Sequence, residues 1–162
     1  MYDLRLDRKL TQALFSRWDK ETKDWVVNAI ASLVVVDHVV EAHEKIALEE
    51  AISLLDSRVE IENMLGMVRR KKMHEIERIQ MSISQAGEIF FYLASIAAID
   101  GKMKKVEADL LKDLGRKLNL SPDFQRSVMQ WGLDQMKHNL KWSEEQRQLN
   151  KQREQLLMNL KG

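Results

Sequence analysis

The sequence predicts an all-α protein, a compact bundle of about seven helices built from two pseudo-repeated halves. Three observations support this fold class. The 162 residues include one proline and six glycines, so the chain lacks the turn residues that a fold of many β-strands needs. Apolar residues recur at the three- and four-residue spacing of amphipathic helices. One stretch of the chain also repeats itself sixty-three residues later.

The repeat consists of an apolar helix that ends in an acid, with a second acid seven residues further on. The first copy runs from Trp25 to Asp37 and the second from Glu88 to Asp100. The matched pairs are Ile30 with Leu93, Ala31 with Ala94, Ser32 with Ser95, Asp37 with Asp100, Glu44 with Glu107 and Leu48 with Leu111. A fixed offset indicates duplicated supersecondary units. We therefore expect pseudo-repeats at about residues 25–56 and 88–119 within a helical domain over 1–141, followed by a C-terminal helical extension over 142–162.

The composition excludes several classes of function. A net charge of +1 gives no general attraction to nucleic acid or to an anionic membrane, so neither is expected as a partner. The chain contains no cysteine, which excludes thiolate catalysis, disulfides and zinc bound by sulfur. Its longest apolar runs fall short of the roughly 20 residues of a membrane span. The charged first residues lack the apolar stretch of a signal peptide, so a cytoplasmic location is expected.

In chain order, the first predicted element is an amphipathic helix over Leu4–Trp18. Val26–Val36 is apolar almost all round, as is typical of a central helix of a bundle. Its run of valines would also suit a strand, but its alanine-rich counterpart Phe90–Ile99 predicts a helix, and the repeat then favours a helix in both places. Glu44–Leu55 has apolar residues on one face and acids on the other, which predicts a surface helix.

The second half of the chain continues the helical pattern. Val59–Met81 predicts one bent helix or two short ones, and Val106–Leu118 repeats the pattern of Glu44–Leu55. Ser121 followed by Pro122 predicts a helix start, with the serine as N-cap. The last forty residues form one long helix or two, because Ser143–Gln146 resembles a capping box that could restart the helix.

The paired acids are the main candidates for a functional site. Asp37 and Asp100 follow the C-terminal ends of apolar helices, where a carboxylate is disfavoured unless a positive charge lies near it. Glu44 and Glu107 fall near the start of the next helix. If the two copies pack about a local two-fold axis, the acids converge, and carboxylates with free main-chain carbonyls suit calcium or magnesium. Glu41 would add a fifth acid. The simpler interpretation is that the aspartates form turns and the glutamates favour a helix start.

The stretch from Leu93 to Glu107, followed by the run from Leu118 to Pro122, resembles the second half of a TerB-like domain, the family named for tellurite resistance proteins. The Asp-Gly-x-hydrophobic-x-x-x-Glu motif of that family stands at residues 100–107. The first half is similar, but His38 stands where glycine is usual. The resemblance covers roughly residues 29–123 and implies an all-helical bundle of two related halves.

The resemblance also implies a function. TerB-like proteins are associated with divalent cation binding through these acids and with bacterial stress or envelope-linked complexes, and they have no established reaction. Carried onto this chain, the motif implies cation ligands at Asp37, Glu44, Asp100 and Glu107. The departure at His38 could add a ligand or close the turn differently.

The C-terminal segment is a candidate partner-binding surface. Trp142, Leu149 and Leu156 are spaced seven residues apart among polar residues. The simpler interpretation is that this helix packs back on the bundle. The alternative is a helix offered to a protein partner or to a second copy of the chain.

These observations favour a non-enzymatic TerB-like module that binds a divalent cation, uses no organic cofactor and serves a stress-response or protein-interaction role. The alternative is a purely structural interaction or oligomerisation module without a metal site. A metal-dependent hydrolase built on the same acids would need a pocket with a general base, and the sequence identifies none.

Overall fold

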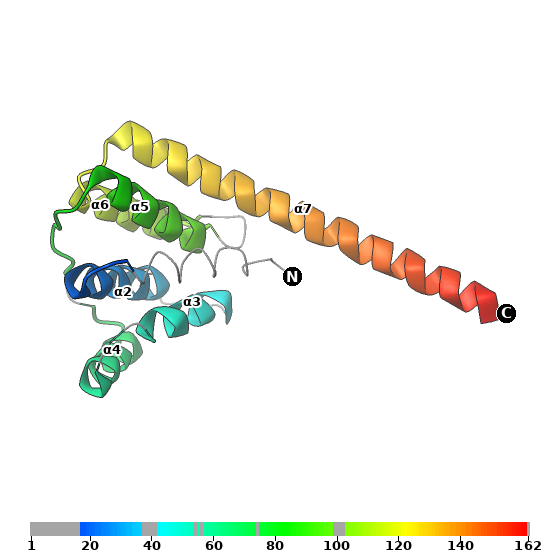
Figure 1. The fold of residues 1–162 in the computed structure, drawn as a ribbon, viewed down its shortest axis with the longest axis horizontal. Coiled ribbons are helices and arrows are strands. Elements are labelled where there is room, and N and C mark those ends of the chain that lie inside the picture. Colours follow the sequence, from blue (N-terminus) through cyan, green and yellow to red (C-terminus); the bar gives the residue numbers. More distant parts are fainter. Residues whose placement is uncertain are drawn as a thin grey trace.

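A computed structural model of the chain describes residues 17–36, 42–53, 55, 57–73, 75–98 and 103–161, with the backbone alone at 42–44, 46 and 47. Figure 1 shows helices packed side by side, with the last one extending far beyond the others. Within the described ranges every regular element is a helix, which confirms the all-α prediction for them. The six helices are α2 (Lys20–Val35), α3 (Ala42–Ile52), α4 (Arg58–Arg70), α5 (Ile83–Ala97), α6 (Lys105–Lys117) and α7 (Pro122–Lys161). Residues 4–16 of the predicted first helix lie outside the described part.

Helix α2 forms the centre of the first half and is buried almost all round, as its apolar sequence predicts. Its start is set by Asp19, whose side chain accepts a hydrogen bond of 2.9 Å from the backbone N–H of Thr22. This bond to the backbone holds the pKa of Asp19 below its usual value. The cap satisfies an amide that the helix itself leaves without a partner, and so fixes where α2 begins.

The starts of the helices in the two helical hairpins follow the sixty-three-residue spacing of the sequence. Helices α2 and α5 begin at Lys20 and Ile83, and helices α3 and α6 begin at Ala42 and Lys105. Matched apolar residues also share the same environment, since all of the following side chains are buried: Ile30 and Leu93, Ala31 and Ala94, Leu48 and Leu111. Helix α2 packs mainly on α3, and α5 packs on α6 and α7.

The predicted helix over Val59–Met81 is wrong in its second half. Helix α4 ends at Arg70 because Lys71 adopts the left-handed conformation, with φ 54°, and closes the helix with backbone bonds to Met67 and Val68. Beyond it, residues 75–82 run without helix across the bundle. Ile76 and Ile79 are buried there.

This irregular segment is held by hydrogen bonds to its neighbours. The indole nitrogen of Trp25 donates to the carbonyl of Glu77 at 2.7 Å. The N–H of Ile79 donates to the carbonyl of Lys117 at 3.2 Å. These bonds hold the irregular segment against both α2 and α6. They also pair backbone groups of a segment that makes no helical hydrogen bonds of its own.

The last helix begins where the sequence predicts. Ser121 is its N-cap, and its hydroxyl accepts a hydrogen bond of 3.2 Å from the N–H of Phe124. Helix α7 then runs for 40 residues without interruption. The restart at Ser143–Gln146 is therefore wrong, because residues with good helical propensity carry the helix through it. Helix α7 also continues through residues 141 and 142, where the boundary of the C-terminal extension was predicted.

Two glycines offer a matched test of this packing. A Cβ on Gly115 would lie 2.6 Å from Cδ of the buried Gln125, whose amide donates to the carbonyl of Leu120 at 2.9 Å. Gly115→Ala is therefore expected to displace Gln125 and lower the free energy of unfolding by about 1–3 kcal/mol. Gly66→Ala meets only the guanidinium of Arg70 at 3.6 Å and is expected to raise the free energy of unfolding by about 0.5–1 kcal/mol. Urea denaturation of both variants checks this, and two changes of the same sign would contradict it.

Candidate functional site

Most of the acids proposed as cation ligands fall outside the part of the chain that the structure describes. Asp37, Glu41 and Asp100 are not among the described residues, and Glu44 lies in α3 with its side chain outside them. Only Glu107 can be placed. The convergence of the two acid pairs therefore stays a prediction.

Glu107 lies in the first turn of α6 and is 6% exposed. A carboxylate at this position interacts favourably with the unpaired N–H groups and the dipole of the helix start, which accounts for an acid there without any ligand. Among the described residues, no group of three or more histidines, aspartates or glutamates comes together in a way that could hold a metal ion.

Helix α7 has two parts with opposite surroundings. We call residues 122–136 the anchor segment and residues 137–161 the distal segment. The anchor segment packs on α5 and α6 through one face, formed by Gln125, Val128, Met129, Gly132 and Met136. A Cβ on Gly132 would lie 3.4 Å from the carbonyl oxygen of Ala94, so the glycine lets α7 approach α5 closely. In the distal segment, every residue from 147 to 161 is exposed.

The favoured interpretation of the C-terminal segment, packing back on the bundle, is wrong for this distal part. Figure 1 shows α7 lying along α5 and α6 at its start and then projecting away from them (yellow to red). The three residues singled out from the sequence, Trp142, Leu149 and Leu156, are 50%, 55% and 60% exposed. A straight helix follows the direction that its anchor sets, and here that direction leads off the bundle.

The exposed apolar residues of the distal segment form a stripe. At about 100° per residue, Trp142, Leu149, Leu156 and Leu160 fall on one face of α7. We call these four residues the stripe. Between 142 and 160, the other residues within about 60° of Leu149 are Glu145, Gln146, Gln152 and Arg153. The stripe is thus an apolar surface with two charges of opposite sign beside it.

A second exposed apolar group, which the sequence alone did not reveal, lies where α5 meets the anchor segment. The rings of Phe91 and Trp131 meet edge to face with centroids 5.0 Å apart, and Phe91 meets Phe124 in the same way at 6.0 Å. Phe91 and Trp131 remain 37% and 45% exposed. Phe91 directly follows the buried Phe90 in the sequence. Nothing in the sequence shows that the ring of Phe91 contacts residues of another helix.

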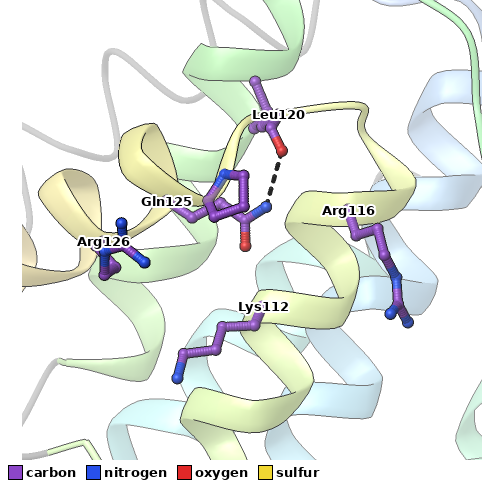
Figure 2. A pocket seen from close by; sticks show the side chains of 6 residues that line it. Lys112, Arg116, Leu120, Gln125 and Arg126 are labelled. Carbon is purple, nitrogen blue, oxygen red and sulfur yellow. Dashed lines mark hydrogen bonds between the residues drawn. The ribbon is translucent and has the colours of Figure 1, made fainter.

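An open cavity of about 360 Å³ lies between the end of α6 and the start of α7. Its lining residues are Lys112, Arg116, Leu120, Pro122, Gln125 and Arg126. Figure 2 shows Arg116 and Arg126 on opposite sides of Gln125, with their guanidinium groups well apart. Arg126 pairs with Asp123, and Arg116 pairs with Asp113. The basic side chains therefore do not converge on one point and are already partly neutralised.

The carboxylate of Asp113, beside this cavity, pairs with neighbouring basic side chains. Burial raises the pKa of Asp113, but the hydrogen bonds and positive charges of Lys117 and Arg116 outweigh it and hold the pKa below its usual value. Lys117 lies 3.0 Å from the carboxylate. The acid stays ionised and balances the basic end of α6, where positive charge suits the helix dipole.

In the described ranges, no helix is both long enough and apolar enough to cross a membrane. No protein-family model, curated protein or solved structure matches the chain.

Proposed function

We propose that the protein is a non-enzymatic interaction module whose helical bundle presents the distal segment of α7 to a protein partner. The observation that carries this proposal is the contrast within one continuous helix. The anchor segment is packed on the bundle, while residues 147–161 are exposed along their whole length and carry large apolar side chains.

A projecting helix of this kind is weak by itself. Most helices in proteins are stabilised by packing an apolar face, whereas residues 147–161 of α7 are exposed all round. Covering one exposed leucine contributes roughly 1.5–3 kcal/mol in favourable burial. The stripe offers three leucines and a tryptophan, which supports a role for the distal segment in the formation of a helix pair or a helix-in-groove complex.

The cavity between α6 and α7 offers little for catalysis. Among its lining side chains, the amine of Lys112 is the group that could act as a base or nucleophile. A catalytic site here would also need a second group to activate or orient that amine, and the lining residues supply none.

The interaction role is tested by a matched pair of substitutions. Leu156→Ser removes a residue of the stripe, whereas Met158→Ser removes an exposed apolar residue two positions on, about 200° away around the helix. Both substitutions lower the helical propensity of the segment by a similar amount. We expect Leu156→Ser to weaken association at least tenfold, measured as self-association or as capture of a binding protein, and Met158→Ser to leave it unchanged. Equal effects of the two substitutions would contradict a role of the stripe.

A second candidate function is the binding of a divalent cation by a TerB-like pair of hairpins. It is supported by the shared sixty-three-residue offset of the helix starts and by the equal burial of the matched apolar residues. We infer from these that the two hairpins are copies of one unit. Glu107, one of the four matched acids, is buried, which is compatible with a role as a ligand.

The cation proposal is tested by thermal unfolding of chelator-treated protein in a titration with calcium and then with magnesium. A ligand that binds the native state raises the melting temperature in a saturable way, by an amount set by the ratio of its concentration to Kd. We expect this rise in the parent protein and its loss in Asp37→Asn with Asp100→Asn. A flat response to both ions in the parent protein would remove the cation site and leave the acids as turn and cap residues.

A further inference from the structure

We propose that the distal segment of α7 pairs antiparallel with the same segment of a second copy of this chain, about a two-fold axis at Leu149. This inference rests on the proposed interaction role and names the partner. It follows from how the residues of the stripe face are ordered along the helix.

The stripe face has matching chemistry on the two sides of Leu149. In an antiparallel pair centred there, each residue lies level with the one equally far on the other side of Leu149 in the second copy. Trp142 and Leu156 are each seven residues from Leu149, Glu145 and Arg153 are each four, and Gln146 and Gln152 are each three. Trp142 therefore meets Leu156, the acid meets the base, and one amide meets the other.

The charges distinguish this pairing from a parallel one. Between 142 and 160, Glu145 and Arg153 are the charged residues within about 60° of Leu149. In a parallel pair, Glu145 would lie beside Glu145 of the second copy, and Arg153 beside Arg153 of the second copy. Like charges at the same level destabilise a helix pair. In the antiparallel pair, Glu145 lies level with Arg153 twice, once on each side of the axis. The remaining charges, such as Glu144, Arg147 and Lys151, face away from the seam.

The reach of the helix also fits. The antiparallel pairing brings Leu160 level with His138 of the second copy, so the seam covers 138–160, about 33 Å of helix. This stops short of Met136, which is buried against the protein's own bundle. The described parts of the two bundles thus stand at opposite ends of the paired helices.

The first test is a charge swap, read as the dissociation constant of the dimer by sedimentation equilibrium. Arg153→Glu turns both Glu145–Arg153 contacts into repulsions and is expected to weaken the dimer about tenfold. Adding Glu145→Arg to the same chain restores opposite charges at both places and is expected to restore the parent affinity. In a parallel pair neither change would replace attraction by repulsion, so an unchanged Arg153→Glu dimer would overturn the proposal.

The second test measures the register directly. Because the chain has no cysteine, a nitroxide can be attached at one introduced cysteine, either at Gln148→Cys or at Lys141→Cys. These sites lie about 20° apart around the helix. In the antiparallel dimer the two labels are offset along the axis by two residues, about 3 Å, at position 148, and by sixteen residues, about 24 Å, at position 141. We expect a short distance at 148 and a long one at 141, measured by pulsed electron spin resonance.

Other outcomes separate this inference from the proposed function. Two short distances would mean a parallel dimer and would overturn the antiparallel pairing. A monomer that still captures a binding protein through Leu156 but not through Met158 would overturn self-pairing and leave the interaction role standing. A monomer without any stripe-dependent association would overturn both.

Discussion

Phe90→Ala is expected to lower the free energy of unfolding by about 3–5 kcal/mol, the largest loss from any single substitution considered for the bundle. Phe90 is fully buried in α5, among the largest side chains of the core, and its ring lies 6.5 Å from that of Phe124 in α7. Truncation would leave a cavity where α5 meets the anchor segment, and a close-packed interior relaxes only partly around such a gap.

The neighbouring Phe91 provides the control. It is 37% exposed and meets Phe124 and Trp131 through the edges of its ring. Phe91→Ala removes these contacts but opens no closed cavity, so we expect a loss of about 1–2 kcal/mol. Urea denaturation of the two variants measures the difference. Equal losses would mean that α5 does not present Phe90 to the core and Phe91 to the surface.

Ending the chain after Lys141 is expected to abolish association while leaving the bundle folded. The last residue of α7 buried on the bundle is Met136, and every residue from 147 onward is exposed. Removal of residues 142–161 therefore takes away four exposed leucines and Trp142 but no buried residue of α7. We expect the free energy of unfolding of the monomer to change by no more than about 1 kcal/mol.

The control for this truncation is a second one, after Gln130, which removes Gly132 and Met136 from the anchor segment. It exposes the face of α5 that α7 covers, so we expect it to unfold or aggregate. Near-ultraviolet circular dichroism and sedimentation separate these outcomes. If the chain ending at Lys141 unfolds like the shorter one, the distal segment belongs to the core and the assignment of the two segments is wrong.

Local chemistry made parts of this fold predictable from the sequence. Ser121 and Pro122 mark the start of α7 because a serine oxygen can accept an amide bond and a proline needs no donor there. The apolar run of α2 predicts a buried helix since no face of it could be left in water. The helix starts of the two hairpins keep the offset of the sequence repeat.

Other parts depend on tertiary contacts that no local pattern carries. The end of α4 is set by Lys71 in a left-handed conformation, which glycine or asparagine would have signalled. Ile76 and Ile79 are three residues apart, as on a helix, but they are buried from an irregular segment that is bonded to Trp25 and Lys117. The three-residue spacing was therefore compatible both with a helix and with an irregular segment. The hydrogen bonds to Trp25 and Lys117 favour the irregular segment.

The surface of the distal segment was likewise predictable from the sequence only in part. The seven-residue spacing of Trp142, Leu149 and Leu156 was legible in the sequence. Whether that stripe turns toward the bundle depends on the direction of α7, which follows from the packing of its anchor segment on α5 and α6. Of the acids in the predicted cation site, Glu107 alone is placed, and its position in the first turn of α6 was expected from helix electrostatics as much as from a ligand.

The measurement that tests the central claim most directly is amide hydrogen exchange along α7 in the parent protein and in Leu149→Ser. A helix without cover opens locally at little cost, whereas a packed helix opens only with the unit it belongs to. We expect residues 125–136 to be protected in both proteins, and residues 142–160 to be protected in the associated parent but not in Leu149→Ser. Protection of 142–160 that survives the substitution, or that is absent from both proteins under conditions of association, would contradict the claim that this segment is the interaction surface.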